Sequence, residues 1–316
     1  MEATLRRRLL VVAQVVVLAV IALFVARTLS AGLRSSGFLH LRFSLPYLLA
    51  SWAALAGYYA LYVGGMDIIL RLLGAPSSLG RVFKLNFATN LGKYLPGGIW
   101  PVFGRLTLGP KLGLPRRVVA PGMVLEAGLS IAGGLLVFFA SLAFGGSLPK
   151  GTQAWQWAAL AAIVVVGTAP PVFRRALAVG FRLAKVDAPV PRLSFPATLG
   201  LVAYYAVSWV VAGFAFRLYT LALVADAPGR VLQYAGVYAA ASVTGLVVLL
   251  APGGIGVREG VISLLLAPVI GGAAATLVGF SARIWSTLLE LTASAVALAL
   301  PVRAAETAEG GEEETG

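Results

Sequence analysis

Long apolar runs separated by short polar connections make up most of the chain. Seven of these runs are about 17 or more residues long, the length that an α-helix needs to cross the hydrocarbon core of a bilayer. They cover residues 9–29, 45–66, 118–144, 155–172, 196–224, 231–250 and 274–300, and a shorter run covers 261–270. The pattern predicts an all-α, polytopic integral membrane bundle with seven or eight transmembrane helices.

Two Pro–Gly–Gly sequences interrupt this pattern. One lies in the moderately apolar segment 85–103 (LNFATNLGKYLPGGIWPVF), and the other in APGGIGVREG, which begins at Ala251. Basic residues flank segment 85–103 on both sides, so we expect it to enter and leave the membrane on one face, as a re-entrant segment or a broken helix. Non-helical backbone at that depth is tolerated only where it is buried in protein or lines a wet cavity.

The two interrupted sequences also resemble each other. LPGGIWPVFGR begins at Leu95 and APGGIGVRE begins 156 residues later at Ala251, and each has an arginine after the break, Arg105 or Arg258. Corresponding interrupted segments in two halves are typical of a transporter binding site, because freed backbone groups and helix N-termini bind polar or anionic groups. The alternative is two tight turns at the membrane surface. The matched positions and the arginines favour a two-half repeat around a binding site.

Charged residues also occur inside the apolar runs. Glu126 lies deep in one run, and Arg283 and Glu290 lie two helical turns apart in the last. A charge at the centre of a spanning helix costs about 2.5–3.5 kcal/mol and usually faces a substrate or ion path in the bundle interior. Function and structural pairing are both consistent with such residues.

We predict that Arg258, Arg283, Glu126 and Glu290 line one polar cavity between the two halves, with Arg258 and Arg105 nearest to an anionic group of the substrate. Two pairs are the natural alternatives for a purely structural ion-pair lattice, Glu126 with Arg283 and Arg105 with Glu290. We also expect Glu126 and Arg283 to be paired within the cavity.

Polar residues precede the first break at helical spacing. Asn86, Asn90 and Lys93 would project toward one helix face. Lys93, Arg105 and Arg258 together suit a phosphate group, since arginine binds it with two hydrogen bonds and lysine acts as a point charge. The full set of predicted substrate-binding residues is Asn90, Lys93, Pro96, Gly97, Gly98, Arg105, Glu126, Pro252, Gly253, Gly254, Arg258, Glu259, Arg283 and Glu290.

Composition and charge agree with a membrane protein. Of 316 residues, 59% are apolar and only 12% are charged, and the mean hydropathy is +0.90. This balance excludes both an ordinary soluble globule and a disordered chain. The 25 Lys and Arg residues against 12 Asp and Glu flank apolar runs, which favours contact with anionic head groups over nucleic acid as a partner.

The basic clusters also predict the orientation. Arg6, Arg7 and Arg8 precede the first run, so we expect a cytoplasmic N-terminus in the cell membrane. The connections at 71–84, 104–117 and 173–192 should face the cytoplasm for the same reason. Residues 1–303 would form one transmembrane domain, followed by a disordered acidic tail at 304–316, while the side of the C-terminus stays open.

Several kinds of chemistry lack the residues they need. The chain has no cysteine and one histidine, His40, so we predict no metal site, no cofactor and no catalytic constellation. General-base or metal-assisted chemistry usually needs paired carboxylates. Outside the tail, only isolated acids such as Glu259 or Asp226 could serve, which disfavours an enzyme.

Four sequences together resemble a known family: NLGKYLPGGIWPVFGR, VLEAG around Glu126, APGGIGVREG and FSARIWSTLLEL. They are similar to the flippase-like membrane domain of lysylphosphatidylglycerol synthases, and the resemblance covers nearly all of residues 5–303. It implies an all-helical membrane domain with re-entrant elements that moves a lipid between leaflets. In two-domain members that lipid is an aminoacylated phosphatidylglycerol. Because this chain ends in a short acidic tail where they carry an aminoacyl-transferase domain, we do not expect it to attach lysine to lipid.

The leading hypothesis is therefore a lipid translocase for an anionic phospholipid or a polyprenyl phosphate-linked lipid, acting as a homo-oligomer or beside a lipid-modifying enzyme. One alternative is a membrane-embedded enzyme such as a polyprenyl-phosphate glycosyltransferase. Others are an ion-coupled transporter, which the same residues would suit, and a structural partner of another membrane enzyme.

Overall fold

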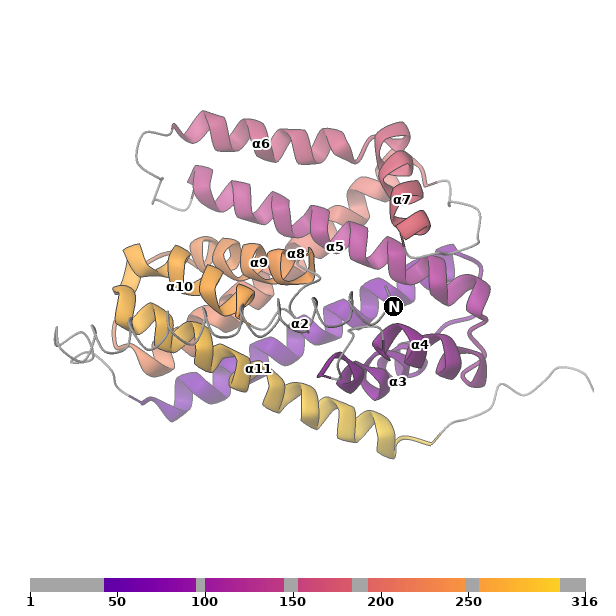
Figure 1. Cartoon of the computed structure of the whole chain (residues 1–316), viewed down its shortest axis with the longest axis horizontal. Coiled ribbons are helices and arrows are strands. Elements are labelled where there is room, and N and C mark those ends of the chain that lie inside the picture. The colour runs from indigo at the N-terminus through magenta and orange to yellow at the C-terminus, as the bar shows by residue number, and fades with distance from the viewer. Residues whose placement is uncertain (1–42, 95–99, 145–152, 184–192, 248–255, 302–316) are drawn as a thin grey trace, which may run out of the picture.

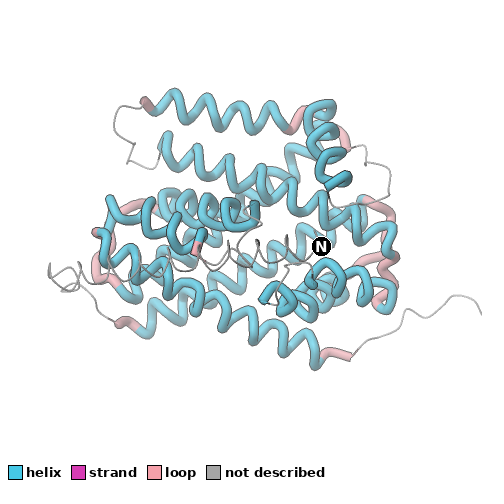
Figure 2. The backbone as a smooth tube through the Cα atoms, viewed as in Figure 1, coloured by secondary structure: helices cyan, strands magenta, loops and turns pink. Residues whose placement is uncertain are grey.

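The computed structural model describes residues 43–94, 100–144, 153–183, 193–247 and 256–301, which form helices and no strands (Figures 1 and 2). The predicted run at 9–29, His40 and the tail lie outside these residues. The helices are α2 (Leu45–Leu72), α3 (Leu79–Asn90), η1 (Leu91–Tyr94), α4 (Trp100–Lys111), α5 (Arg116–Phe144), α6 (Ala154–Gly167), α7 (Pro170–Leu183), α8 (Phe195–Leu223), α9 (Val231–Val247), α10 (Val257–Ile270) and α11 (Gly272–Ala299).

Three of these helices, α2, α5 and α8, are long and apolar enough to cross a membrane. Helices α6 and α7 pass the same test as a pair, although a bend of 76° separates them, and would make a fourth crossing. The prediction of an all-helical chain with helices that could span a membrane is thus confirmed, but the described residues hold three or four such helices where the apolar runs predicted seven or eight. Runs 118–144 and 196–224 coincide closely with α5 and α8, and run 261–270 forms most of α10.

Small residues let the long helices approach closely. A Cβ atom on Gly213 of α8 would lie 2.1 Å from the Cα atom of Ala235 on α9, and one on Gly133 of α5 would lie 2.8 Å from the backbone nitrogen of Ala206 on α8. Such close backbone approach is typical of helix packing in membranes, where van der Waals contact stabilises association. Helices α5, α8 and α9 therefore form one tightly packed group.

Hydrogen bonds to backbone carbonyls join helix ends, two at one end of the bundle and one at the other. The Ser44 amide donates to the Ala222 carbonyl over 2.9 Å, joining the start of α2 to the end of α8. Arg230 likewise donates to the Phe144 carbonyl over 3.1 Å, joining α9 to the end of α5. At the opposite end, the Lys84 ammonium donates to the Leu300 carbonyl, so α11 ends beside α3.

Helix α7 corrects one prediction. Residues 173–192 were expected to be a polar connection, but α7 continues to Leu183. Its Phe173, Leu177 and Phe181 recur every four residues and are buried, whereas the arginines between them are exposed. The basic residues thus belong to the outer face of an amphipathic helix. Its buried stripe has so few apolar residues that the sequence of this helix resembles a polar loop.

Helices α10 and α11 meet at a single residue. Gly271 ends α10 and precedes α11 with φ +84° and ψ 150°, a conformation that residues with a side chain rarely adopt. With 14 residues, α10 is about 21 Å long at 1.5 Å per residue, which is shorter than the hydrocarbon core of about 30 Å. Helices α10 and α11 form a tight helical hairpin with one short arm.

Candidate functional site

A cavity of about 290 Å³ lies where most of the helices converge. Its wall takes residues from α2, α3, η1, α4, α5, α8, α9, α10 and α11. We call it the central pocket. Helices α6 and α7, which lie on one side of the bundle in Figure 1, contribute nothing to its wall.

The long helices reach the central pocket at their midpoints. Ser130 has fourteen residues of α5 on either side (116–129 and 131–144), and Trp209 has fourteen residues of α8 on either side (195–208 and 210–223). Tyr58 and Tyr59 are the two central residues of α2 (45–72). In helices that cross a membrane, these positions lie at half its depth. The central pocket is therefore at the middle of the three candidate spans.

The short helices reach the same pocket with their ends. Asn90 is the last residue of α3, Lys93 belongs to η1, and Arg258 is the second residue of α10. Arg105 lies on α4, the helix that follows the first break. The predicted residues Asn90, Lys93, Arg105, Arg258 and Glu290 thus line one cavity.

Glu290 connects the two halves of the chain inside this pocket. Its Oε2 atom accepts a 2.5 Å bond from Nζ of Lys93, 197 residues away in sequence. Its Oε1 atom accepts a 3.1 Å bond from the Tyr59 hydroxyl. Both carboxylate oxygens are therefore engaged, and the Glu290 side chain is only 10% exposed.

Arg105 and Glu126 form a second ion pair in the wall. Nη1 of Arg105 lies 3.1 Å from Oε2 of Glu126, and the two side chains are 14% and 2% exposed. Among the described residues, the other Glu126 oxygen and the Arg105 Nε atom have no hydrogen-bond partner. Since buried charges persist only when paired, this pair accounts for a glutamate at the middle of an apolar helix.

Arg258 differs from these cations. Its guanidinium carbon lies 4.6 Å above the centre of the Tyr238 ring, a cation–π contact. No carboxylate of the described residues lies within 4.0 Å of it. A guanidinium has five N–H donors, so one that lies over a ring with no carboxylate beside it can still donate to an anion.

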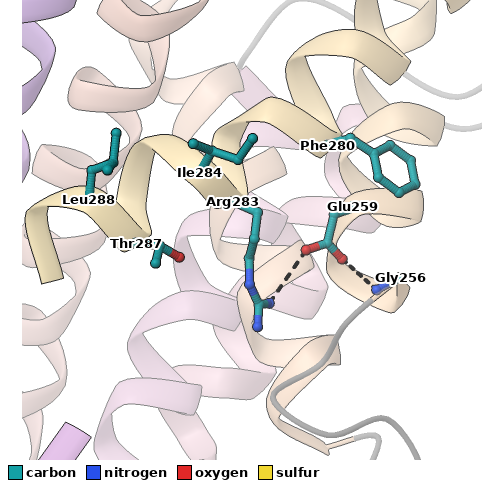
Figure 3. A pocket seen from close by; sticks show the side chains of 7 residues that line it. All are labelled: Gly256, Glu259, Phe280, Arg283, Ile284, Thr287 and Leu288. Atoms are coloured by element: carbon teal, nitrogen blue, oxygen red, sulfur yellow. Dashed lines mark hydrogen bonds and ion pairs between the residues drawn. The ribbon is translucent and has the colours of Figure 1, made fainter. Parts of the chain in front are cut away.

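A second pocket, of about 360 Å³, opens between α10 and α11 (Figure 3). Nη1 of Arg283 lies 3.4 Å from Oε1 of Glu259. The other oxygen of Glu259 accepts a 2.6 Å bond from the Gly256 amide, which satisfies a free backbone N–H at the start of α10. The remaining wall is mostly apolar and includes the exposed Ile284.

The predicted pairings were wrong. Glu126 pairs with Arg105 and not with Arg283, and Glu290 pairs with Lys93 and not with Arg105. Arg283 lines the second pocket with Glu259, so the four predicted charges do not share one cavity. The reason is that α10 lies against the first part of α11, where Glu259 reaches Arg283, whereas η1 reaches α11 farther along, at Glu290.

The predicted glycine and proline residues cannot be placed in either pocket, because Pro96, Gly97, Gly98, Pro252, Gly253 and Gly254 lie outside the described residues.

The sequence reasoning missed the aromatic lining of the central pocket. Tyr58, Tyr59 and Tyr62 of α2 face Trp209 and Tyr238 across it. The spacing of one and four residues puts the three tyrosines on one helix face, which was the available signal. Tyrosine is equally common at membrane interfaces, so the spacing alone could not place them in a cavity.

Nor do known proteins supply an identity for this site: the chain matches no family model, no curated protein and no solved structure.

Proposed function

We propose that this protein is a lipid translocase that moves an anionic lipid between the leaflets through the central pocket. The observation that carries the proposal is the depth of the pocket. Three apolar helices contribute their midpoints to it, and three cations and a carboxylate line it there. Charged groups at that depth usually mark a substrate or ion path.

The short helices support the same function. Transporters commonly bind substrate near the midplane, where broken helices end. Helices α3, α4 and α10 have 12, 12 and 14 residues, each too short to cross about 30 Å of hydrocarbon. We propose that α3 to α4 and α10 are re-entrant elements in a bundle of seven or eight transmembrane helices.

The ion pairs support a two-half organisation. In each half, the short helix after a Pro–Gly–Gly sequence pairs with the next long helix: α4 with α5 through Arg105 and Glu126, and α10 with α11 through Glu259 and Arg283. We propose on this basis, and on the resemblance of the motifs, a flippase-like domain similar to that of lysylphosphatidylglycerol synthases.

Leaflet exchange in liposomes tests the proposal. Protein reconstituted into phosphatidylcholine vesicles with fluorescent phosphatidylglycerol should let dithionite bleach more than the outer-leaflet half of the label. Ser242 lines the pocket from α9, so Ser242→Trp should fill the cavity and abolish exchange. Val207→Trp is the matched control, because Val207 is 57% exposed on the outer face of α8. Equal exchange with both variants would contradict a path through the central pocket.

A further inference from the structure

We propose that the central pocket is selective for a head group with one net negative charge, a phosphodiester with a neutral, hydroxylated substituent. This inference rests on the proposed function and names its substrate class. Head groups with two negative charges, such as a phosphate monoester, and head groups with no net charge or a positive one would bind less tightly.

The charge count in the wall carries the inference. The described wall holds three cations, and two of them are already neutralised: Lys93 by Glu290 at 2.5 Å, and Arg105 by Glu126 at 3.1 Å. Arg258 contacts the Tyr238 ring instead of a carboxylate. The described wall of the pocket therefore has one positive charge in excess.

The chain segments next to the described lining do not alter this count. Residues 95–99 (LPGGI) and 248–255 (VLLAPGGI), which precede α4 and α10, contain no ionisable side chain. The second ion pair, between Glu259 and Arg283, is neutral in itself. The excess charge of Arg258 thus has no acidic counterpart in the sequence immediately around the pocket.

An uncompensated charge is costly in a buried pocket, so the net charge of the wall makes binding depend on the charge of the head group. A single phosphate charge neutralises Arg258, so neither partner is left buried and uncompensated. A second negative charge would have to break one of the two ion pairs or stay unpaired. A head group with no net charge would leave Arg258 as it is, and a cationic one would add repulsion.

Hydrogen-bonding groups in the wall suit a hydroxylated substituent. Asn86 is 3% exposed and lines the pocket, and neither its amide nitrogen nor its amide oxygen has a partner among the described residues. An amide offers both donors and an acceptor, which matches hydroxyl groups better than an ammonium or a second phosphate. A glycerol or similar polyol beside the phosphodiester meets this requirement.

Ligand-induced stabilisation in detergent tests the selectivity without requiring transport. A ligand that binds the folded state raises the melting temperature with concentration. The probes are dihexanoyl phosphatidylglycerol, phosphatidic acid and phosphatidylcholine at about pH 8, where the monoester is dianionic because its second pKa is about 6. We expect phosphatidylglycerol to bind at least about 10-fold more tightly than the other two. Equal or tighter binding of phosphatidic acid would overturn the inference.

Charge variants make the test specific. Arg258→Gln removes the excess charge, so the preference for phosphatidylglycerol over phosphatidylcholine should disappear. Glu290→Gln raises the excess to two, so the preference should shift toward phosphatidic acid. If that variant does not fold, Arg258→Gln alone decides the assignment. Arg174→Gln, on the exposed face of α7, is the matched control and should bind like the wild type. An unchanged preference in Arg258→Gln would refute the assignment.

Two further outcomes separate the hypotheses. If inorganic phosphate stabilises the protein as strongly as phosphatidylglycerol does, the site takes free anions and the lipid class is wrong. If binding is charge-selective but vesicles show no leaflet exchange, the proposed translocation fails while the selectivity stands. If vesicles show leaflet exchange but binding shows no charge preference, the selectivity fails while the translocation stands.

Discussion

Arg105 on α4 and Glu126 on α5 form a buried ion pair of 3.1 Å, and Glu259 on α10 and Arg283 on α11 form its counterpart with the charges exchanged. In both cases a short helix that follows a Pro–Gly–Gly sequence is joined to the long helix that comes next. The short helix carries the arginine in the first pair and the glutamate in the second, so neither short helix could pair with the other's long helix. Each pair thus fixes its short helix against the long helix that follows it.

The buried pair predicts strong coupling. Glu126→Gln should lower the free energy of unfolding by about 3–5 kcal/mol, because it leaves the Arg105 guanidinium buried without a counter-charge. The double change with Arg105→Gln should recover part of this loss. Denaturant unfolding in detergent of the wild type, the two single variants and the double variant measures the coupling.

The pair of buried Asp67 and exposed Arg71 is the control for that cycle. Their side chains lie 2.9 Å apart, four residues apart on α2, and the Arg71 side chain is 59% exposed. Because water screens the exposed Arg71 guanidinium, this pair should contribute about 1 kcal/mol or less. Additive effects at Arg105 and Glu126 would contradict a functional pairing of the two charges.

The close approach of α8 and α9 predicts opposite effects for the same substitution at two glycines of α8. Gly213→Ala would place a Cβ 2.1 Å from the Ala235 Cα atom, so it should destabilise the protein by at least about 1–3 kcal/mol. Gly200→Ala meets nothing within 4 Å and should be neutral or stabilising by about 0.5–1 kcal/mol. Thermal unfolding monitored by tryptophan fluorescence compares them; equal melting temperatures would refute the close packing.

The helix ends predict a membrane orientation. Single cysteines at Arg182 and Ala299 should resist an impermeant maleimide in intact cells, because we expect the basic end of the bundle to face the cytoplasm and the Lys84 contact places the end of α11 at that end. A cysteine at Gln153, before α6, should be labelled from outside. The cysteine-free chain gives no background. Labelling at Ala299 but not at Gln153 would reverse the scheme.

The hydroxyl of Tyr59 predicts a smaller effect at the centre of α2. Tyr59→Phe removes its 3.1 Å hydrogen bond to Glu290, which should cost about 1.5–3 kcal/mol because the acceptor is charged. Tyr58→Phe is the control, since the structure shows no hydrogen bond from that hydroxyl within the described residues. Chemical denaturation of both variants measures the difference, and equal losses would contradict a specific role for Tyr59.

The length of the apolar runs was sufficient to predict the long helices. Burying a run of more than about 18 apolar residues leaves few alternatives to a helix, so α5 and α8 begin and end close to the predicted residues. The start of α8 also follows local chemistry, because the Ser194 hydroxyl caps the Ala197 amide. Helical spacing of four residues likewise puts Asp67 beside Arg71 on α2, and the structure has them paired.

The pairing of charges could not be predicted in this way. Arg283 and Glu290 are separated by two turns on α11, and their spacing puts them on one face. Which neighbour each one meets depends on where α10 and η1 lie along α11, and no periodicity in the sequence records that register. Helix α7 was missed for a different reason: its arginines are exposed because the helix is amphipathic, whereas the charge rule for membrane topology treats any basic stretch as a loop.

The single-residue joint at Gly271 has a mechanical consequence. A Cβ on Gly279 would lie 2.9 Å from the Glu259 carbonyl oxygen, so α10 and α11 are held together along their shared length as well as at their junction. The two helices therefore form one rigid unit. Arg258 belongs to α10 and Glu290 to α11, so a rigid movement of this pair of helices would displace both residues together and change the distance between Glu290 and Lys93.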